Sequence, residues 1–219
     1  MSDVVLFGTG DFARMARIYL DEDSPHEVKA FTVHERYLTT PELEGLPVVP
    51  FERLEESHPP GSHEMFVAIG FSRVNEARAE VYRECKARGY RLITYVSSRA
   101  IPAGELRIGD NCFVFEANVI QPNVRIGNNV ILWSGNHIGH DATIGDHCFI
   151  ASHVVVSGNV TIGESCFVGV NATFRDGIQV APRCVIGAAA LIMKDTVEGG
   201  VYAVKGTDPR DVKSWDLDI

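Results

Sequence analysis

The chain has 219 residues, of which 45% are hydrophobic and 22% are charged. This balance is typical of globular proteins and excludes a collagen-like or wholly disordered chain. The formal net charge of -9 makes nucleic acid and anionic membranes unfavourable partners. Charges are scattered through the first 20 residues and no long apolar run occurs, so we expect no membrane insertion, no signal peptide and a cytoplasmic location.

Residues 1–100 predict an α/β domain. Strands are expected at residues 4–7, 28–33, 65–69 and 92–96, with a short helix from residue 50. A longer helix should follow the glycine turn at residues 8–13. Another should be capped by Ser72 and end at Gly89, with a buried face formed by Val74, Ala77, Val81 and Cys85. Alternating strands and helices predict a small parallel sheet, a half-Rossmann unit.

A six-residue repeat occupies the second part of the chain. Fifteen positions spaced by six residues, from Ile108 to Ile192, are all apolar. This period excludes a helix face, which repeats every 3.6 residues. It fits a solenoid with three flat faces per coil, so we predict five 18-residue coils over residues 101–195 with these side chains pointing inward. The charged residues 196–219 are expected to cap the last coil.

The cysteines support this coil length. The chain has five, an odd number without a CxxC pair, which fits neither a disulfide framework nor a zinc ribbon. Four of them are separated by 36, 18 and 18 residues: Cys112, Cys148, Cys166 and Cys184. We therefore expect one column of small apolar side chains inside the solenoid.

The Ile-Gly hexapeptide pattern over roughly residues 104–193 resembles that of the hexapeptide acyltransferases. This resemblance implies a left-handed parallel β-helix and a homotrimer. It also implies that acetyl-CoA, or another acyl donor, binds in the groove between neighbouring subunits.

A glycine turn, Gly8-x-Gly10-x-x-Ala13, follows the first predicted strand and opens a helix. Its backbone amides are suited to hold a phosphate at the helix N-terminus. As a dinucleotide signature it is incomplete, because the second strand ends in Thr32, Val33 and His34 without the expected acid. Two interpretations stay open: a tight turn required for packing, and the diphosphate site of a nucleotide-sugar.

Histidines are the candidates for catalysis or metal binding in the repeat. The spacing of His137, His140, His147 and His153 does not match a three-histidine metal site, so we expect no metal. His140 is followed by Asp141, and Gly158 lies one coil later, which leaves room for a thioester beside the imidazole. Histidine suits a general base at neutral pH, and the Gly158 amide is a candidate oxyanion donor. An ordinary turn histidine is the alternative.

The order of the two units, a glycine-turn α/β unit followed by a β-helix, resembles that of two groups of bacterial enzymes. These are the nucleotide-amino-sugar N-acetyltransferases and the sialic-acid O-acetyltransferase-like proteins, which act in surface-glycan biosynthesis. By resemblance, His140 is the general base and Asp141 its acidic helper. The resemblance further places acetyl-CoA against Gly158, Val170 and Ala188.

The chain departs from the family pattern at two positions. Phe149 stands where some relatives have a histidine that contacts CoA, and Trp133 stands where they have an asparagine near the acceptor sugar. His137 is a candidate for part of the lost polar contact, and a structural role, hydrogen-bonding within the turn, is the favoured alternative. The resemblance assigns the diphosphate to Gly8, Gly10 and Asp11, and the base or ribose to Thr32, Val33 and His34. Arg73 is either a partner for a phosphate or a solvated residue in the first turn of a helix.

The sequence therefore predicts a homotrimeric, acetyl-CoA-dependent transferase that acetylates the amino group of a nucleotide-linked amino-sugar. O-acetylation of a sialic-acid-like sugar is one alternative. A non-catalytic nucleotide-sugar-binding scaffold is another.

Overall fold

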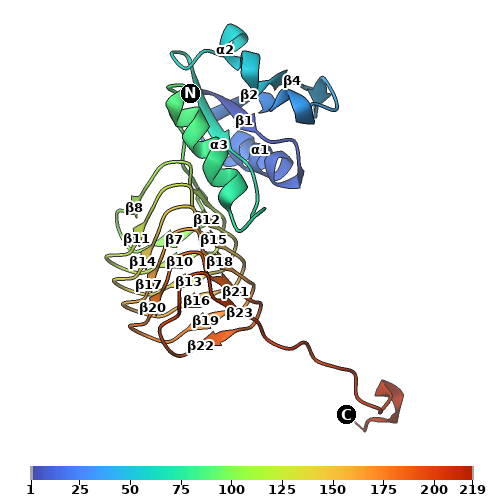
Figure 1. Cartoon of the computed structure of the whole chain (residues 1–219), viewed down its shortest axis with the longest axis vertical. Helices are drawn as coiled ribbons and strands as arrows, with labels where there is room; N and C mark the ends of the chain where they lie inside the picture. Colours follow the sequence, from blue (N-terminus) through green and yellow to red (C-terminus); the bar gives the residue numbers. More distant parts are fainter. Residues whose placement is uncertain (1, 219) are drawn as a thin grey trace.

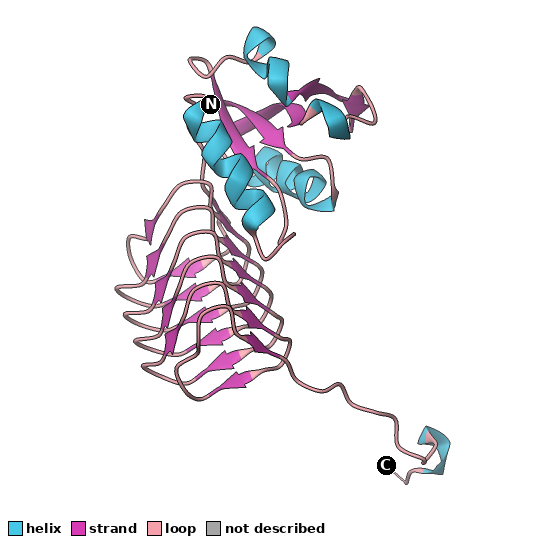
Figure 2. Cartoon of the chain, viewed as in Figure 1, coloured by secondary structure: helices cyan, strands magenta, loops and turns pink. Residues whose placement is uncertain are grey.

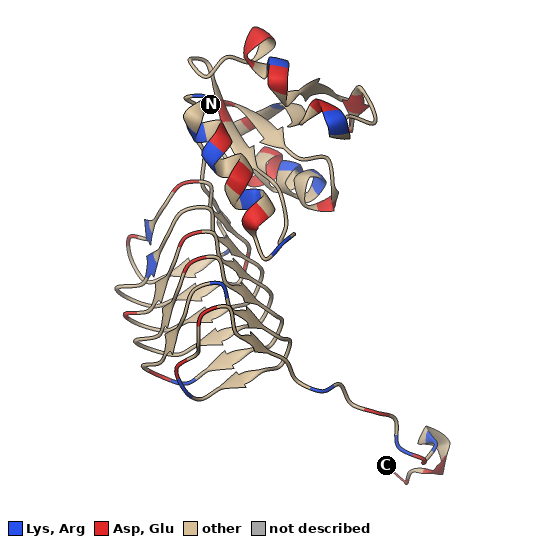
Figure 3. Ribbon diagram, viewed as in Figure 1, with Lys and Arg blue, Asp and Glu red and all other residues tan. Residues whose placement is uncertain are grey.

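The computed structural model describes residues 2–218. An α/β unit sits on one end of a three-sided parallel β-helix, and the C-terminal tail leaves the opposite end (Figure 1). Lys, Arg, Asp and Glu crowd the α/β unit and are sparse along the strands of the β-helix (Figure 3). This distribution follows the sequence, in which charged residues are much rarer between residues 100 and 193 than before or after them.

The α/β unit is built on one sheet with the strand order β3-β4-β2-β1-β5. Its strands are β1 (Ser2–Phe7), β2 (His26–Val33), β3 (Glu42–Leu43), β4 (Leu46–Pro50) and β5 (His63–Val67). Its helices are α1 (Asp11–Asp23), α2 (Leu54–Ser57) and α3 (Glu76–Ala87), with 3-10 turns at Glu35–Tyr37 and Phe51–Arg53. Pairing is parallel except for β3 and β4. That hairpin, turning at Glu44 and Gly45 with positive φ at both, was not expected.

The two faces of this sheet bury different partners. Alternate residues of β1 point to opposite sides, as a pleated strand requires. Val5 and Phe7 pack with Val81 and Cys85 of α3, which confirms part of the predicted helix face. Val4 and Leu6 pack with α1 in a cluster that continues into the β-helix. The α/β unit and the β-helix thus share one hydrophobic core.

Two boundaries of the α/β unit differ from the expectation. Helix α3 begins at Glu76 without a cap from Ser72, because Arg73, Val74 and Asn75 have positive φ. The buried Asn75 side chain donates to the Cys166 carbonyl at 3.0 Å, and this tertiary contact holds the turn and leaves Val74 37% exposed. The expected strand at 92–96 also divides: Leu92 bridges to Met65, whereas Tyr95–Val96 joins the β-helix.

The β-helix has three faces of short strands (Figure 2). The first face holds β6 (Tyr95–Val96), β9 (Phe113–Val114), β12 (Ile131–Leu132), β15 (Phe149–Ile150), β18 (Phe167–Val168), β21 (Val185–Ile186) and β23 (Val201–Tyr202). The second face holds β7 (Ile101–Pro102), β10 (Val119–Ile120), β13 (His137–Ile138), β16 (Val155–Val156), β19 (Thr173–Phe174) and β22 (Leu191–Ile192). The third face holds β8 (Arg107–Ile108), β11 (Arg125–Ile126), β14 (Thr143–Ile144), β17 (Thr161–Ile162) and β20 (Gln179–Val180).

The predicted coil length and core are confirmed, but the solenoid extends beyond the five coils expected over residues 101–195, because β6 and β23 add strands to the first face at its two ends. Neighbouring strands on a face pair 18 residues apart, as His137 pairs with Val155. All fifteen repeat positions lie in the core of the prism, with only Ile108 partly buried, and the four cysteines of the column are buried there. Every sixth residue from Asn111 to Ala189 has positive φ, which places one left-handed residue at each corner. His147 and His153, for which the sequence suggested no role, are two of these corner residues.

The C-terminal segment divides into two parts. Strand β23 pairs with β21 on the last coil, and Asp195 and Thr196 side chains accept hydrogen bonds from the backbone amides of Gln179 and Ala181. Residues 203–218, which include the 3-10 turn Ser214–Asp216, are exposed and extend away (Figures 1 and 2). In the single chain, the expected cap is therefore made by residues 194–202.

Candidate functional site

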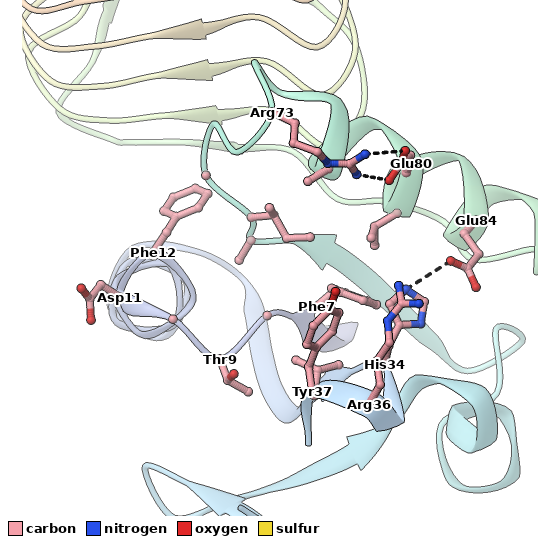
Figure 4. Close-up of a pocket in the computed structure, with 18 residues that line it drawn as sticks. Phe7, Thr9, Asp11, Phe12, His34, Arg36, Tyr37, Arg73, Glu80 and Glu84 are labelled. Carbon is pink, nitrogen blue, oxygen red and sulfur yellow. Dashed lines mark hydrogen bonds and ion pairs between the residues drawn. The ribbon is translucent and has the colours of Figure 1, made fainter. Parts of the chain in front are cut away.

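A cavity of about 620 Å³, which we call the N-terminal pocket, opens at the carboxyl ends of β1, β2 and β5. This edge of a parallel sheet is where open α/β folds bind ligands. All the residues that line the cavity belong to the α/β unit (Figure 4). Six of the predicted substrate-binding residues meet there: Gly8, Gly10, Asp11, Val33, His34 and Arg73.

The glycine turn forms one wall of the N-terminal pocket. Gly8 has φ of +126°, and a Cβ there would lie 2.7 Å from the Ala68 carbonyl oxygen, so packing alone already requires glycine. Gly10 has open space around it and directly precedes α1, whose first amides lack helical partners. The Asp11 side chain points away from His34 and Tyr37 (Figure 4). The turn thus offers backbone amides rather than a carboxylate to this end of the cavity.

Charged side chains line the opposite wall. Arg73 forms a two-pronged ion pair with Glu80 of α3 (Figure 4), with one of its hydrogen bonds at 3.1 Å. His34 lies between two carboxylates, with its Nδ1 at 3.1 Å from Glu52 and its Nε2 at 3.4 Å from Glu84. Arg36 and Tyr37 complete this end of the cavity. The sequence did not indicate four of the lining residues, because nothing in their spacing pointed to a common cavity: Arg36, Tyr37, Glu80 and Glu84.

Thr32 does not lie in the N-terminal pocket. Its side chain is fully buried, and its hydroxyl donates to the Val49 carbonyl at 2.7 Å. The expectation that Thr32 contacts a base or ribose was therefore wrong, since the residue ties β2 to β4.

A second cavity, of about 400 Å³, lies on the first face of the β-helix. We call it the aromatic groove, because four of the residues that line it are aromatic: Phe71, Trp133, Phe149 and Phe167. The rings of Phe149 and Phe167 stack at 5.7 Å, and Phe71 from the α/β unit lies 4.8 Å from Phe167. Val170 and Ala188 also line it. The structure thus gathers four positions that the resemblance assigns to the donor or the acceptor sugar, Trp133, Phe149, Val170 and Ala188, in one apolar groove.

His140 and Asp141 lie at the corner between the second and third faces. His140 Nδ1 is 2.8 Å from an Asp141 carboxylate oxygen, and the other oxygen accepts from the Asn123 side chain at 3.0 Å. The hydrogen bonds from His140 and Asn123 lower the pKa of Asp141. The Gln121 side chain accepts from the His140 amide at 2.8 Å. The imidazole is therefore oriented on its Nδ1 side, and it remains 52% exposed.

The space above Gly158 is not vacant, contrary to the expectation. A Cβ on this residue would lie 2.5 Å from His140 Nε2 and 2.8 Å from a carboxylate oxygen of Asp176. These two side chains converge on Gly158 from the coils on either side of it. Glycine is therefore required here by the imidazole and the carboxylate. Asp176 was not among the predicted site residues, although the 18-residue period places it two coils after His140.

His137 is half-buried on β13 of the second face and does not line either cavity.

Within residues 2–218, no group of three or more His, Cys, Asp or Glu side chains is placed to hold a metal ion. Over the same residues, no helix is long and apolar enough to cross a membrane.

Comparisons with known proteins agree with this architecture. Residues 124–158 match the bacterial transferase hexapeptide (six repeats) family. The acetyltransferase domain of PglB from Neisseria gonorrhoeae superposes with a TM-score of 0.79 at 22% identity, covering 96% of this chain and 100% of that one. PerB from Caulobacter crescentus, solved with CoA and GDP-perosamine, gives 0.80 at 24%, covering 93% and 95%.

The chain has the fold of these proteins. Its β-helix is the left-handed parallel β-helix of the hexapeptide repeat. WeeI from Acinetobacter baumannii shares the fold as well, with a TM-score of 0.78 at 18% identity and coverage of 92% of this chain and 96% of that one. Among curated protein sequences none matches.

Proposed function

We propose that this protein transfers the acetyl group of acetyl-CoA to the amino group of a nucleotide-linked amino-sugar, in the synthesis of bacterial surface glycans. Two proteins of the same fold support the ligands: the PglB domain was solved with acetyl coenzyme A, and PerB with CoA and GDP-perosamine. In this chain the donor is assigned to the aromatic groove at Phe149, Val170 and Ala188, and to Gly158. Trp133 is assigned to the acceptor sugar.

The observation that carries the proposal is the His140–Asp141 pair. Its 2.8 Å contact engages Nδ1 and leaves the Nε2 lone pair to accept a proton. The neutral amine attacks the thioester carbonyl carbon, and one of its protons moves to Nε2. The C–S bond then breaks, the amide forms, and the imidazolium returns that proton to the departing thiolate. Asp141 holds the imidazole in orientation and stabilises its cationic form.

The groups that line the N-terminal pocket suit a nucleotide as its ligand. The helix α1 amides behind the glycine turn and the guanidinium groups of Arg36 and Arg73 suit a diphosphate. His34 and Tyr37 provide ring surfaces for the base or ribose. To bind phosphate in this arrangement, Arg73 leaves its ion pair with Glu80 and pairs with the phosphate instead.

We propose a homotrimer because the N-terminal pocket and His140 lie apart within a single chain. The α/β unit packs on the first face through Phe113, Phe149 and their neighbours, whereas His140 lies at the corner between the other two faces. The second face also exposes a column of apolar side chains that suits packing against another copy: Ile101, Val119, Val155 and Leu191. His137 lies within this column.

The test is an acceptor panel. Thiol release from acetyl-CoA is measured with UDP-, GDP- and dTDP-linked amino-sugars, and with a free sialic-acid-like sugar. We expect turnover with a nucleotide amino-sugar. His140→Ala should reduce kcat by about 100-fold or more without changing the melting temperature. Binding of a nucleotide-sugar without thiol release would support the scaffold alternative, and unchanged turnover in the variant would overturn the base assignment.

A further inference from the structure

The candidate base faces a second carboxylate besides Asp141. His140 and Asp176 lie two coils apart, and their side chains meet over Gly158 between them. His140 Nε2 and an Asp176 oxygen are 2.5 Å and 2.8 Å from the point that a Gly158 Cβ would occupy. Asp176 therefore faces the nitrogen that is available to take a proton, because Asp141 engages the other one.

The separation of these two groups suits one small polar group between them. His140 Nε2 and the Asp176 oxygen both lie within 2.8 Å of the same point, the Gly158 Cβ position. A single nitrogen placed between the two atoms can therefore form hydrogen bonds of about 2.9 Å to each of them. No ion pair joins His140 directly to Asp176 in the described part of the chain, whereas the His140–Asp141 pair is present. The gap between the two side chains thus has a proton acceptor, His140 Nε2, on one side and an anion, the Asp176 carboxylate, on the other.

The charge of this gap distinguishes two classes of acceptor. An aliphatic amine is mainly an ammonium ion at neutral pH, and a carboxylate forms a charge-assisted hydrogen bond with it. A sugar hydroxyl is neutral and gains only an ordinary hydrogen bond. A carboxylate at this position therefore favours an amine over a hydroxyl as the attacking group.

We propose that Asp176 binds the ammonium group of the acceptor and selects N-acylation over O-acylation. This inference rests on the proposed function. The bound ammonium first loses one proton to His140 Nε2, and the imidazolium passes it to water. The resulting amine, still hydrogen-bonded to Asp176, then attacks the thioester and gives its second proton to Nε2, from which the proton passes to the thiolate.

The experiment compares the unchanged protein with Asp176→Asn on two acceptors. These are the best amino-sugar nucleotide from the panel and its analogue with a hydroxyl in place of the amine. We expect KM for the amine to rise about tenfold or more, since a charge-assisted hydrogen bond is lost. We expect kcat to change less than about threefold, and KM for acetyl-CoA and affinity for the hydroxyl analogue to stay unchanged.

Two further variants keep the test decisive. Asp176→Glu retains the charge and should recover part of the amine affinity. Glu164→Gln removes an exposed carboxylate from another corner of the same prism and should leave all the constants unchanged. Equal losses for the amine and the hydroxyl analogue, or an unchanged KM for the amine in Asp176→Asn, would overturn the role of Asp176. Failure of the unchanged protein on every acceptor would instead refute the proposed function.

Discussion

Among single residues, Gly158 most directly controls the candidate base. Its hydrogen faces the region where His140 Nε2 and the Asp176 carboxylate converge, and the nearest of these atoms leaves no room for a methyl group. The glycine has no positive φ to require it. The constraint therefore comes from the two side chains above it rather than from the backbone.

We expect Gly158→Ala to reduce kcat by about 100-fold or more, because the new Cβ displaces the imidazole from its position. Thiol release and the melting temperature should be measured together, since both contacting groups are exposed side-chain ends and the fold should persist. Gly61→Ala is the matched control, because a Cβ there meets nothing within 4 Å. Retained turnover in Gly158→Ala would show that the orientation of His140 over Gly158 is not needed.

Among the elements, α3 makes the strongest tie between the α/β unit and the β-helix. Arg78 on this helix is fully buried. Its guanidinium donates to the carbonyls of Gly70, His147 and Cys148 at 2.7, 2.9 and 3.1 Å, and more weakly to Asn129. Burial lowers its pKa to about 10, which still leaves it charged at neutral pH. One cation thus satisfies backbone groups from both units.

Removing the Arg78 hydrogen bonds should lower the stability of the folded protein. We expect Arg78→Ala to lower the free energy of unfolding by at least about 3 kcal/mol, since several buried carbonyls lose a charged donor. Arg78→Lys should recover only part, because an ammonium has fewer donors than a guanidinium. Denaturant titration measures the effect. Arg83→Ala, on the exposed side of α3, should change stability by less than about 0.5 kcal/mol, and an equal loss there would contradict this account.

A ladder of corner side chains makes a second tie at the corner between the third and first faces. The Val67 amide donates to Asn111, Asn111 donates to Asn129, and Asn129 donates to His147 Nδ1 at 2.9 Å. Burial lowers the pKa of His147 below its ordinary value of 6.5, against the opposing effect of Asp146. The ladder therefore needs a neutral imidazole, because a protonated Nδ1 cannot accept the last hydrogen bond.

This ladder predicts a pH dependence of stability. Because the His147 pKa is lower in the folded than in the unfolded protein, its contribution is complete above pH 6.5 and is lost as the pH falls through the folded value. His147→Asn keeps a residue that tolerates the positive φ of this corner and does not titrate. We expect its unfolding free energy to fall less between pH 7.5 and 5.5 than that of the unchanged protein. Parallel curves would contradict the prediction.

At the scale of the whole molecule, the proposed parts of the site do not meet within one chain. The N-terminal pocket is lined by residues 7 to 84 alone, and His140 lies on a corner of the β-helix away from the face on which the α/β unit packs. If both parts belong to one site, as we propose, the base of one copy has to meet the pocket of another. On this proposal, activity is a property of the assembly.

Mixed assemblies test that statement. Two variants that we expect to be inactive alone, His140→Ala and Arg73→Glu, are denatured together, refolded in equal amounts and assayed for thiol release. If each site combines the base of one subunit with the pocket of its neighbour, about one quarter of the sites in a cyclic trimer regain both intact parts. We expect activity near that fraction. A mixture as inactive as its components would place the whole site in one chain.

The prism was predictable because its interactions repeat at a fixed separation. Each inward residue, such as Ile138 or Val156, packs on a neighbour one coil away, so the period of six appears in the sequence and defines the core. The same period predicts the cysteine column. It also puts Asp176 at the same corner as His140, two coils later. The left-handed corners also carry a signal, since five of them are asparagine: Asn111, Asn123, Asn129, Asn159 and Asn171.

Tertiary structure decided the features that depend on contacts between the two units. Ser72 is a plausible helix cap in the sequence, but Asn75 binds the Cys166 carbonyl 91 residues away and starts α3 later. Tyr95 and Val96 have the pattern of a sheet strand, yet they pair with β9 as the first rung of the β-helix. Contacts that repeat at a fixed separation along the chain produce a period in the sequence. A single contact between distant segments overrides local preference and leaves no period to detect, so only the folded chain reveals it.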